Sequence, residues 1–228
     1  MSEKEQILAR IREALRVSAP VPGRHGEPSQ HPTRLASAGT MRQWLPAVGT
    51  TFEERLALFR KNALELKADF QLLNRRDEFS TVLPRLRDAE NWERVGAHAG
   101  ALTDAACQAL ALPVCRTDQS YSITELEQCD VGLTECDALV AQTGSVLVTS
   151  RSAGGRALSV LPPHHVVLAR REQLVADLSD AFALLQEKYG ANYPSFISFI
   201  TGPSRTGDIE RVLVVGAHGP KKLTIICV

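Results

Sequence analysis

A polar segment near the C-terminus carries the side chains best suited to binding an anion. Residues 201–210 read T-G-P-S-R-T-G-D-I-E, between two apolar runs. Its glycines permit backbone conformations closed to other residues, and Pro203 fixes one φ angle while neighbouring amides stay free to face a ligand. Arg205 offers a planar bidentate fork, and the hydroxyls beside it are adaptable donors. We predict a phosphate or carboxylate site that includes Gly202, Pro203, Ser204, Arg205, Thr206, Asp208 and Glu210.

An ordinary turn would explain the same residues differently. Gly-Pro pairs are common in turns. In that case Ser204 would cap a short helical turn, and Arg205 would pair with Asp208 or Glu210. We favour a site because few plain turns concentrate two hydroxyls, a guanidinium and two glycines.

A second candidate segment, residues 141–146, reads A-Q-T-G-S-V. Thr143 and Ser145 place two hydroxyls around Gly144, and so small a residue lets a ligand approach the backbone amides closely. The alternative is a plain turn that leads into a strand.

The third candidate segment, residues 156–165, reads R-A-L-S-V-L-P-P-H-H and precedes an apolar strand. Arg156 and His164 are its candidate binding residues, because an imidazole can donate to a carboxylate or exchange protons near neutral pH. A structural histidine is the alternative. The same two interpretations apply to His218, which precedes Gly219.

Metal and nucleotide sites have no matching motif. Adjacent side chains on an extended segment point to opposite faces, so His164 and His165 are poorly placed to share one ion. The sequence has no H-x-H, H-E-x-x-H, G-x-G-x-x-G or Walker pattern. We expect no metal site.

The five cysteines, Cys107, Cys115, Cys129, Cys136 and Cys227, include no C-x-x-C pair. We therefore expect no iron–sulfur or zinc cluster on this chain. Cys129, Cys136 and Cys227 lie in or beside apolar runs, so we interpret them as small core residues rather than nucleophiles.

Charge and hydropathy exclude several classes of partner. The 26 basic and 26 acidic side chains cancel, so no positive field favours nucleic acid or an anionic membrane surface. No stretch approaches 18 apolar residues, and the N-terminus is charged where a signal peptide needs an apolar core. We expect a cytoplasmic protein, and its 44% hydrophobic content suffices for a sizeable core.

The N-terminal region is expected to be separate from the main domain. Residues 3–17 have apolar side chains at helical spacing, which predicts an amphipathic helix. Residues 18–40 carry four prolines and three glycines, which is typical of a flexible linker. We therefore divide the chain into an arm, residues 1–40, and an α/β domain, residues 41–228.

Within the domain, apolar runs alternate with helical patterns. Thr51 and Glu54 form a capping-box spacing, which predicts a helix whose apolar face continues through Leu66 to Phe70. Further helices are expected at 77–83 and beyond, 102–110 and 172–189, with Leu174, Leu178 and Phe182 facing inward. Strands are expected at 94–97, 114–116, 131–134, 145–149, 165–169, 195–200, 212–215 and 222–228. The alternation predicts an α/β fold with a mainly parallel sheet. Residues 137–142 are expected to form a helical turn or loop, and 222–228 to pair with 211–215.

Four ordered motifs together resemble the lactate-utilization (LUD) domain family: T-E-C-D-A-L-V-A-Q-T-G-S-V, R-A-L-S-V-L-P-P-H-H, F-I-T-G-P-S-R-T-G-D-I-E and V-G-A-H-G-P-K-K-L. The resemblance spans residues 50–228. It implies a sandwich like that of the NagB, ribose-5-phosphate isomerase and CoA-transferase group, with ligands at the carboxyl ends of sheet strands. It also implies a role in oxidising L-lactate to pyruvate with two companion proteins that carry iron–sulfur clusters. Together with the missing cluster ligands and the loop of Arg205, this leads us to expect a non-redox component that binds an anionic substrate or cofactor.

Two departures from the family pattern affect the expected chemistry. Gln142 stands where the family often has an acidic residue, and Gly207 where it often has alanine. A neutral amide cannot act as a general base, so acid–base catalysis is not expected at position 142.

Two other functions stay open. One is a free-standing enzyme acting on a sugar phosphate or acyl-CoA, for which Glu210 is the candidate nucleophile. The other is a regulatory or scaffold module.

Overall fold

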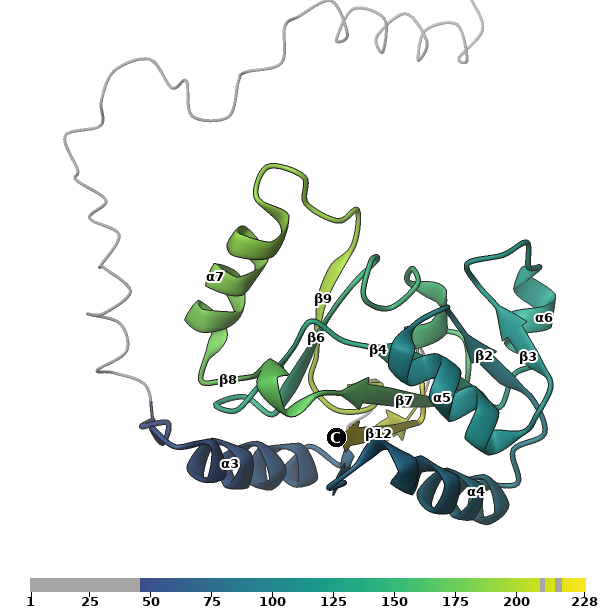
Figure 1. Ribbon diagram of the computed structural model, residues 1–228, viewed down its shortest axis with the longest axis horizontal. Helices are drawn as coiled ribbons and strands as arrows, with labels where there is room; N and C mark the ends of the chain where they lie inside the picture. The colour runs from purple at the N-terminus through teal and green to yellow at the C-terminus, as the bar shows by residue number, and fades with distance from the viewer. Residues whose placement is uncertain (1–45, 210–211, 216–218) are drawn as a thin grey trace, which may run out of the picture. The chain divides into compact units, whose positions relative to one another are not determined.

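The computed structural model describes residues 46–209, 212–215 and 219–228, all within the unit Leu45–Val228 (Figure 1). The expected N-terminal helix and linker, together with Glu210 and His218, lie outside the described residues.

A six-stranded sheet has every neighbouring pair parallel, which confirms the predicted α/β class. Parallel neighbours need crossover connections, and the alternating helices supply them. Its strands, in spatial order, are β1 (Asp69–Leu72), β12 (Lys222–Cys227), β7 (His164–Ala169), β4 (Val131–Glu135), β2 (Val95–Ala97) and β3 (Val114–Arg116).

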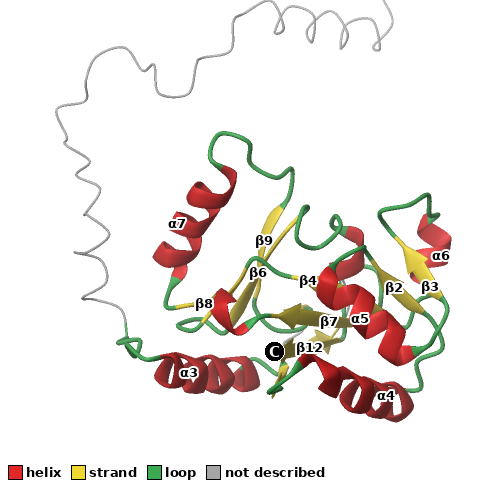
Figure 2. Cartoon of the chain, in the orientation of Figure 1, coloured by secondary structure: helices red, strands yellow, loops and turns green. Residues whose placement is uncertain are grey.

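A second sheet of four strands carries the middle of the chain (Figure 2). Its spatial order is β8 (Leu174–Val175), β5 (Ala138–Val140), β6 (Ser145–Thr149) and β9 (Ile197–Ile200). The pairs β5–β6 and β6–β9 are antiparallel. A separate antiparallel pair, β10 (Arg205–Ile209) and β11 (Val212–Val215), follows β9.

Helices cover the outer faces of the two sheets. The helices α4 (Phe79–Glu90) and α5 (Ala101–Leu110) share a buried cluster with one face of the parallel sheet. On the second sheet, α7 (Leu178–Tyr189) packs against Ala138, Val140 and Leu147. A short helix, α6 (Ile123–Glu127), begins at the capping residue Ser122 and packs through Leu126. The 3-10 turns are Arg76–Glu78, Ala157–Ser159 and Arg171–Gln173.

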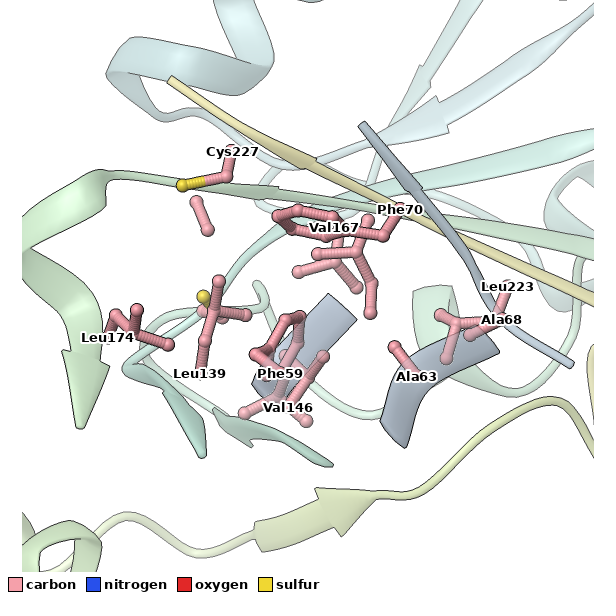
Figure 3. Packing of buried hydrophobic residues seen from close by; sticks show 14 of the residues in the cluster. Phe59, Ala63, Ala68, Phe70, Leu139, Val146, Val167, Leu174, Leu223 and Cys227 are labelled. Atoms are coloured by element: carbon pink, nitrogen blue, oxygen red, sulfur yellow. The ribbon is translucent and has the colours of Figure 1, made fainter. Parts of the chain in front are cut away.

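The central core fills the space between the sheets and is closed by helix α3 (Phe52–Glu65) (Figure 3). Thr51 and Glu54 start this helix with the predicted capping box. Phe59 packs edge to face on Phe70 of β1, with ring centroids 5.3 Å apart. Because side chains alternate along a strand, β7 sends Val167 into this core and Val166 into the cluster under α4 and α5.

Several predicted elements were wrong in detail. Helix α3 ends at Glu65, and Phe70 lies in β1 because Lys67 turns the chain at a φ of 67°. Residues 138–140 form strand β5, not a helical turn. The helix expected from residue 172 begins at Leu178, after β8, and its Phe182 is 58% exposed instead of inward.

The last strand was also misplaced. We expected residues 222–228 to pair with 211–215, but β12 lies between β1 and β7 in the parallel sheet, and β11 pairs with β10. Burial explains this, since five of its six residues are buried and an apolar strand gains most at the centre of a sheet covered on both faces.

Candidate functional site

A cavity of about 210 Å³ lies where the loop after β9 meets the start of β12. Much of its wall is small or backbone-rich, which leaves room for a ligand to approach main-chain groups. The lining residues are Ser159, His165, Ile200, Thr201, Gly202, Pro203, Ser204, Gly219, Pro220 and Leu223.

Two hydrogen bonds hold the loop in place. The Ser204 amide donates to the Pro220 carbonyl over 2.9 Å, which ties the loop to the segment before β12. At its other end, the hydroxyls of Ser145 and Thr201 share a hydrogen bond of 2.8 Å. The structure thus brings Ser145 of the second candidate segment against the first, as neighbours on β6 and β9.

Gly202 sets the path of the loop. Its φ is +84°, in the region that favours glycine, and a Cβ there would lie 2.6 Å from the Leu66 carbonyl oxygen. The same position lies 3.3 Å from Arg205 Nη2. The Arg205 side chain is exposed, and its guanidinium reaches back over a residue that lines the cavity.

The two histidines of β7 lie on opposite faces of the sheet. His165 lines the cavity, and its Nε2 shares a hydrogen bond of 2.8 Å with Thr134 Oγ1. His164, the candidate chosen from the sequence, points the other way, toward Trp92, and its Nε2 lies 2.9 Å from Thr224 Oγ1. His164 therefore does not line this cavity, because consecutive residues of a strand alternate.

Neither imidazole is suited to proton exchange at neutral pH. Burial lowers the pKa of His165 to about 3 and that of His164 to about 4. Both rings are therefore neutral near pH 7. The role for His165 that this geometry allows is that of a neutral hydrogen-bonding group in the cavity wall.

Thr143 and Gly144 are absent from the cavity wall, and Gly144 lies against helix α3. Gly144 has a φ of +66°, and a Cβ there would lie 2.7 Å from the Ala63 amide nitrogen. Asn62 donates from Nδ2 to the carbonyls of Ala141, at 2.9 Å, and Gln142, at 2.8 Å. This turn is thus an anchor between α3 and the second sheet. The Thr143 hydroxyl is buried and has no hydrogen-bond partner among the described residues.

Arg156 lies apart from the cavity wall. Its side chain is exposed, with the guanidinium carbon 5.9 Å from the centre of the Phe196 ring. The contribution of this segment is instead Ser159, which lines the cavity and donates from Oγ to the Arg156 carbonyl over 2.9 Å.

The remaining predicted residues divide into two groups. Thr206 and Asp208 lie in β10, where the backbone of Arg205 pairs with Val215 and that of Thr206 with Val214. Glu210 and His218 fall outside the described residues. Sequence reasoning did not select the cavity residues Ser159, His165, Ile200, Thr201, Pro220 and Leu223. His165 could have been found from the sequence, because adjacent strand residues face opposite sides and it is the alternative to His164.

The cavity lies at the amino-terminal ends of β7 and β12, where His165 and Leu223 are each the second residue. The resemblance implied the opposite, carboxyl edge. There Glu135 accepts from the Leu102 amide at the start of α5 over 2.7 Å and pairs with Arg170 over 3.2 Å. The backbone amide of Glu135 donates to His98 Nε2 over 3.2 Å. These groups of the carboxyl edge bond one another.

The described part of the chain has neither a metal-ligand cluster nor a membrane-spanning helix. Across residues 46–209, 212–215 and 219–228, no cluster of three or more His, Cys, Asp or Glu side chains is placed to hold a metal ion. In the same ranges, no helix combines the length and the apolar character needed to cross a bilayer.

Comparison with known proteins identifies the family. The LUD domain matches residues 87–228, which include every residue of the cavity wall. The chain belongs to the LUD domain family.

Several curated relatives carry the name lactate utilization protein C. Lactate utilization protein C of Shouchella clausii is 39% identical over 112 residues, which cover 49% of this chain and 49% of that protein. The protein of the same name from Geobacillus sp. (strain WCH70) is 40% identical over 109 residues, and that from Bacillus subtilis is 36% identical over 109 residues; these cover 47% of this chain and 45% of each relative. The chain thus spans about half the length of the curated relatives it matches.

A solved structure shares the LUD fold. The crystal structure of a DUF162 family protein from Deinococcus radiodurans superposes with a TM-score of 0.63 at 23% identity. The match covers 78% of this chain and 99% of that one. It therefore supports the arrangement of elements described above.

Proposed function

We propose that this chain takes part in lactate utilization as a non-redox component of a multi-protein system that oxidises L-lactate to pyruvate. Its own task is to bind a small anionic substrate or cofactor in the cavity described above. The family membership and the names of its relatives support the pathway.

One observation carries the binding role. The loop Thr201–Ser204 and the segment Gly219–Pro220, far apart from Ser159 and His165 in sequence, converge on one cavity. Arg205 stands beside it with an exposed guanidinium over Gly202. Hydroxyls and an exposed bidentate cation around a small space suit a carboxylate or phosphate.

The cavity volume favours a small ligand. At about 210 Å³ it lies below the roughly 300–1,000 Å³ typical of sites for drug-sized molecules. A three-carbon carboxylate or an inorganic phosphate fits this size class, whereas most of a CoA molecule would extend outside. This supports lactate, pyruvate or phosphate over an acyl-CoA.

Replacing Arg205 tests the binding role. We expect Arg205→Ala to weaken binding by about 1.5–3 kcal/mol, the range for a hydrogen bond to a charged group, or roughly 10- to 150-fold in Kd. Isothermal titration calorimetry with L-lactate, pyruvate, phosphate and CoA in turn measures this. The matched control is Arg85→Ala, an exposed arginine on α4 outside the cavity wall, which should bind like the wild type.

Two outcomes count against the proposal. If the wild-type protein gives no heat with any of the four probes, the proposal that the cavity binds a small anion is wrong. If a tagged protein from cells grown on lactate recovers no iron–sulfur partner, the multi-protein role is wrong, whatever the calorimetry shows.

A further inference from the structure

Two cysteines meet at the far edge of the parallel sheet, away from the anion cavity. Cys115 lies on edge strand β3, paired in register with Gly96 of β2. Paired residues of neighbouring parallel strands direct their side chains to the same face. A Cβ placed on Gly96 would lie 3.7 Å from Cys129 Cβ, so Cys129 covers the position next to Cys115. Leu126 and Leu158 fill the space beside Gly96, since their methyl groups would lie 2.6 Å and 3.0 Å from such a Cβ, and Cys129 packs next to them.

The packing around them agrees with this placement. Cys129 is 1% exposed, in a small cluster with Leu126 and Leu158, and Cys115 packs against that cluster. Each thiol also contributes to the pKa shift of the other, which places the two side chains within interaction range. Cys129 has a second contact, from its Sγ to the Glu125 carbonyl at 3.5 Å.

Solvent reaches one member of the pair. Cys115 is half-buried and lines a separate cavity of about 320 Å³, whose wall includes Arg94, Arg116, Tyr121 and Glu125. By contrast, Cys136 and Cys227 are 2% and 0% exposed within the central core. A small reagent can therefore reach Cys115 without unfolding the protein.

We propose that Cys115 and Cys129 are an oxidation site that closes to an intramolecular disulfide when a peroxide enters the Cys115 cavity. The Cys115 sulfur attacks one peroxide oxygen, the O–O bond breaks, and a sulfenic acid and water form. The Cys129 sulfur then attacks the sulfenic sulfur, and its proton leaves with the hydroxyl as a second water. Overall, two thiols and one hydrogen peroxide give one disulfide and two waters.

The environment makes both thiols slow to react near neutral pH. Burial raises the pKa of Cys129 to about 12, and burial followed by the charge of Glu125 raises the pKa of Cys115. Because the thiolate is the attacking species, closure is slow near pH 7 and accelerates as the pH rises. A disulfide here joins β3 to the turn after α6, which borders the cavity.

Peptide mapping of the whole protein tests the inference. The purified chain is treated with a small excess of hydrogen peroxide at pH 7 and pH 9, alkylated under denaturing conditions, and digested without reductant. We expect a linked peptide pair that contains Cys115 and Cys129, forms faster at pH 9, and disappears after reduction. Cys107→Ser, the matched control, should retain it, whereas Cys115→Ser and Cys129→Ser should each lose it.

A trivalent arsenical gives a second readout that does not depend on oxidation. Phenylarsine oxide binds two neighbouring thiols, so the native chain should take up one equivalent, and Cys115→Ser should take up none. The inference is overturned if Cys129 stays alkylatable after peroxide treatment while Cys115 is oxidised alone. It is equally overturned if the linked pair is Cys136 with Cys227.

Discussion

Two consecutive histidines on β7 are buried without a charge. Their pKa values are lowered from 6.5 to about 4 for His164 and about 3 for His165, chiefly by burial. In the unfolded chain both regain ordinary values, so between pH 6.5 and pH 4 the unfolded state binds more protons than the folded one. Stability is therefore lost as the pH falls through that range.

We expect His164→Gln to reduce this pH dependence. Its amide can keep the hydrogen bond to Thr224 and does not titrate. Between pH 7 and pH 5, each buried histidine costs on the order of 2 kcal/mol of unfolding free energy, so the variant should lose about that much less than the wild type. Urea denaturation at the two pH values measures the difference. An unchanged pH dependence would show that His164 is not buried as a neutral group.

At the residue scale, the sequence indicated a segment that lines the cavity, but not which of the two histidines does so. The residue types of the loop 201–205 predicted a binding segment, and four of these residues line the cavity. The alternation rule also predicted that His164 and His165 would face apart. The sequence did not show which of the two faces the cavity, because this depends on what packs on each face of β7. The neighbours that decide it, Trp92 and β12, are distant in sequence.

One side chain of helix α3 makes two hydrogen bonds to the second sheet. Asn62 donates to two carbonyls, Ala141 and Gln142, in the turn between β5 and β6. Asn62→Ala would leave both carbonyls without this donor, and a lost buried hydrogen bond of this kind costs about 1–3 kcal/mol.

Thermal and urea unfolding measure that cost. We expect Asn62→Ala to lower stability by this amount, while the exposed neighbour Lys61→Ala stays within about 0.5 kcal/mol of the wild type. Equal stabilities for the two variants would mean that Asn62 does not anchor the turn.

The elements that were predicted correctly have strong local signals. The capping box at Thr51 and the valine-rich run of β6 each define an element from within a few residues. Two of the missed strands, β5 and β8, are three and two residues long, so no periodicity can distinguish them from a turn or a helix start. They exist because neighbouring strands supply their hydrogen bonds, as Leu139 pairs with both Val146 and Leu174.

For the molecule as a whole, we expect central strands of a sheet to resist local unfolding more than edge strands do. Strands β12 and β7 have partners on both sides and buried residues on both faces. Strands β3 and β9 lie at sheet edges and are only partly buried. We expect hydrogen–deuterium exchange to be slowest in β7 and β12 and fastest in β3 and β9. Equal exchange in β7 and β9 would contradict this order.

The packing of one sheet on the other was beyond prediction from sequence. Alternation shows that a strand has two apolar faces, but not which distant segment covers each. The central core combines Phe59 of α3, Val146 of β6 and Ile225 of β12, whose positions in the chain are unrelated. The cavity depends on the same long-range arrangement, since His165 lies on β7 of the parallel sheet and Ser204 follows β9 of the second sheet.

The indole of Trp92 packs on His164 with ring centroids 5.0 Å apart, and the next residue along that strand, His165, lines the cavity at the start of β12. Trp92 is the only tryptophan among the described residues. The fold therefore places a natural fluorophore directly behind the cavity wall, where its emission is sensitive to any displacement of β7 when the cavity fills.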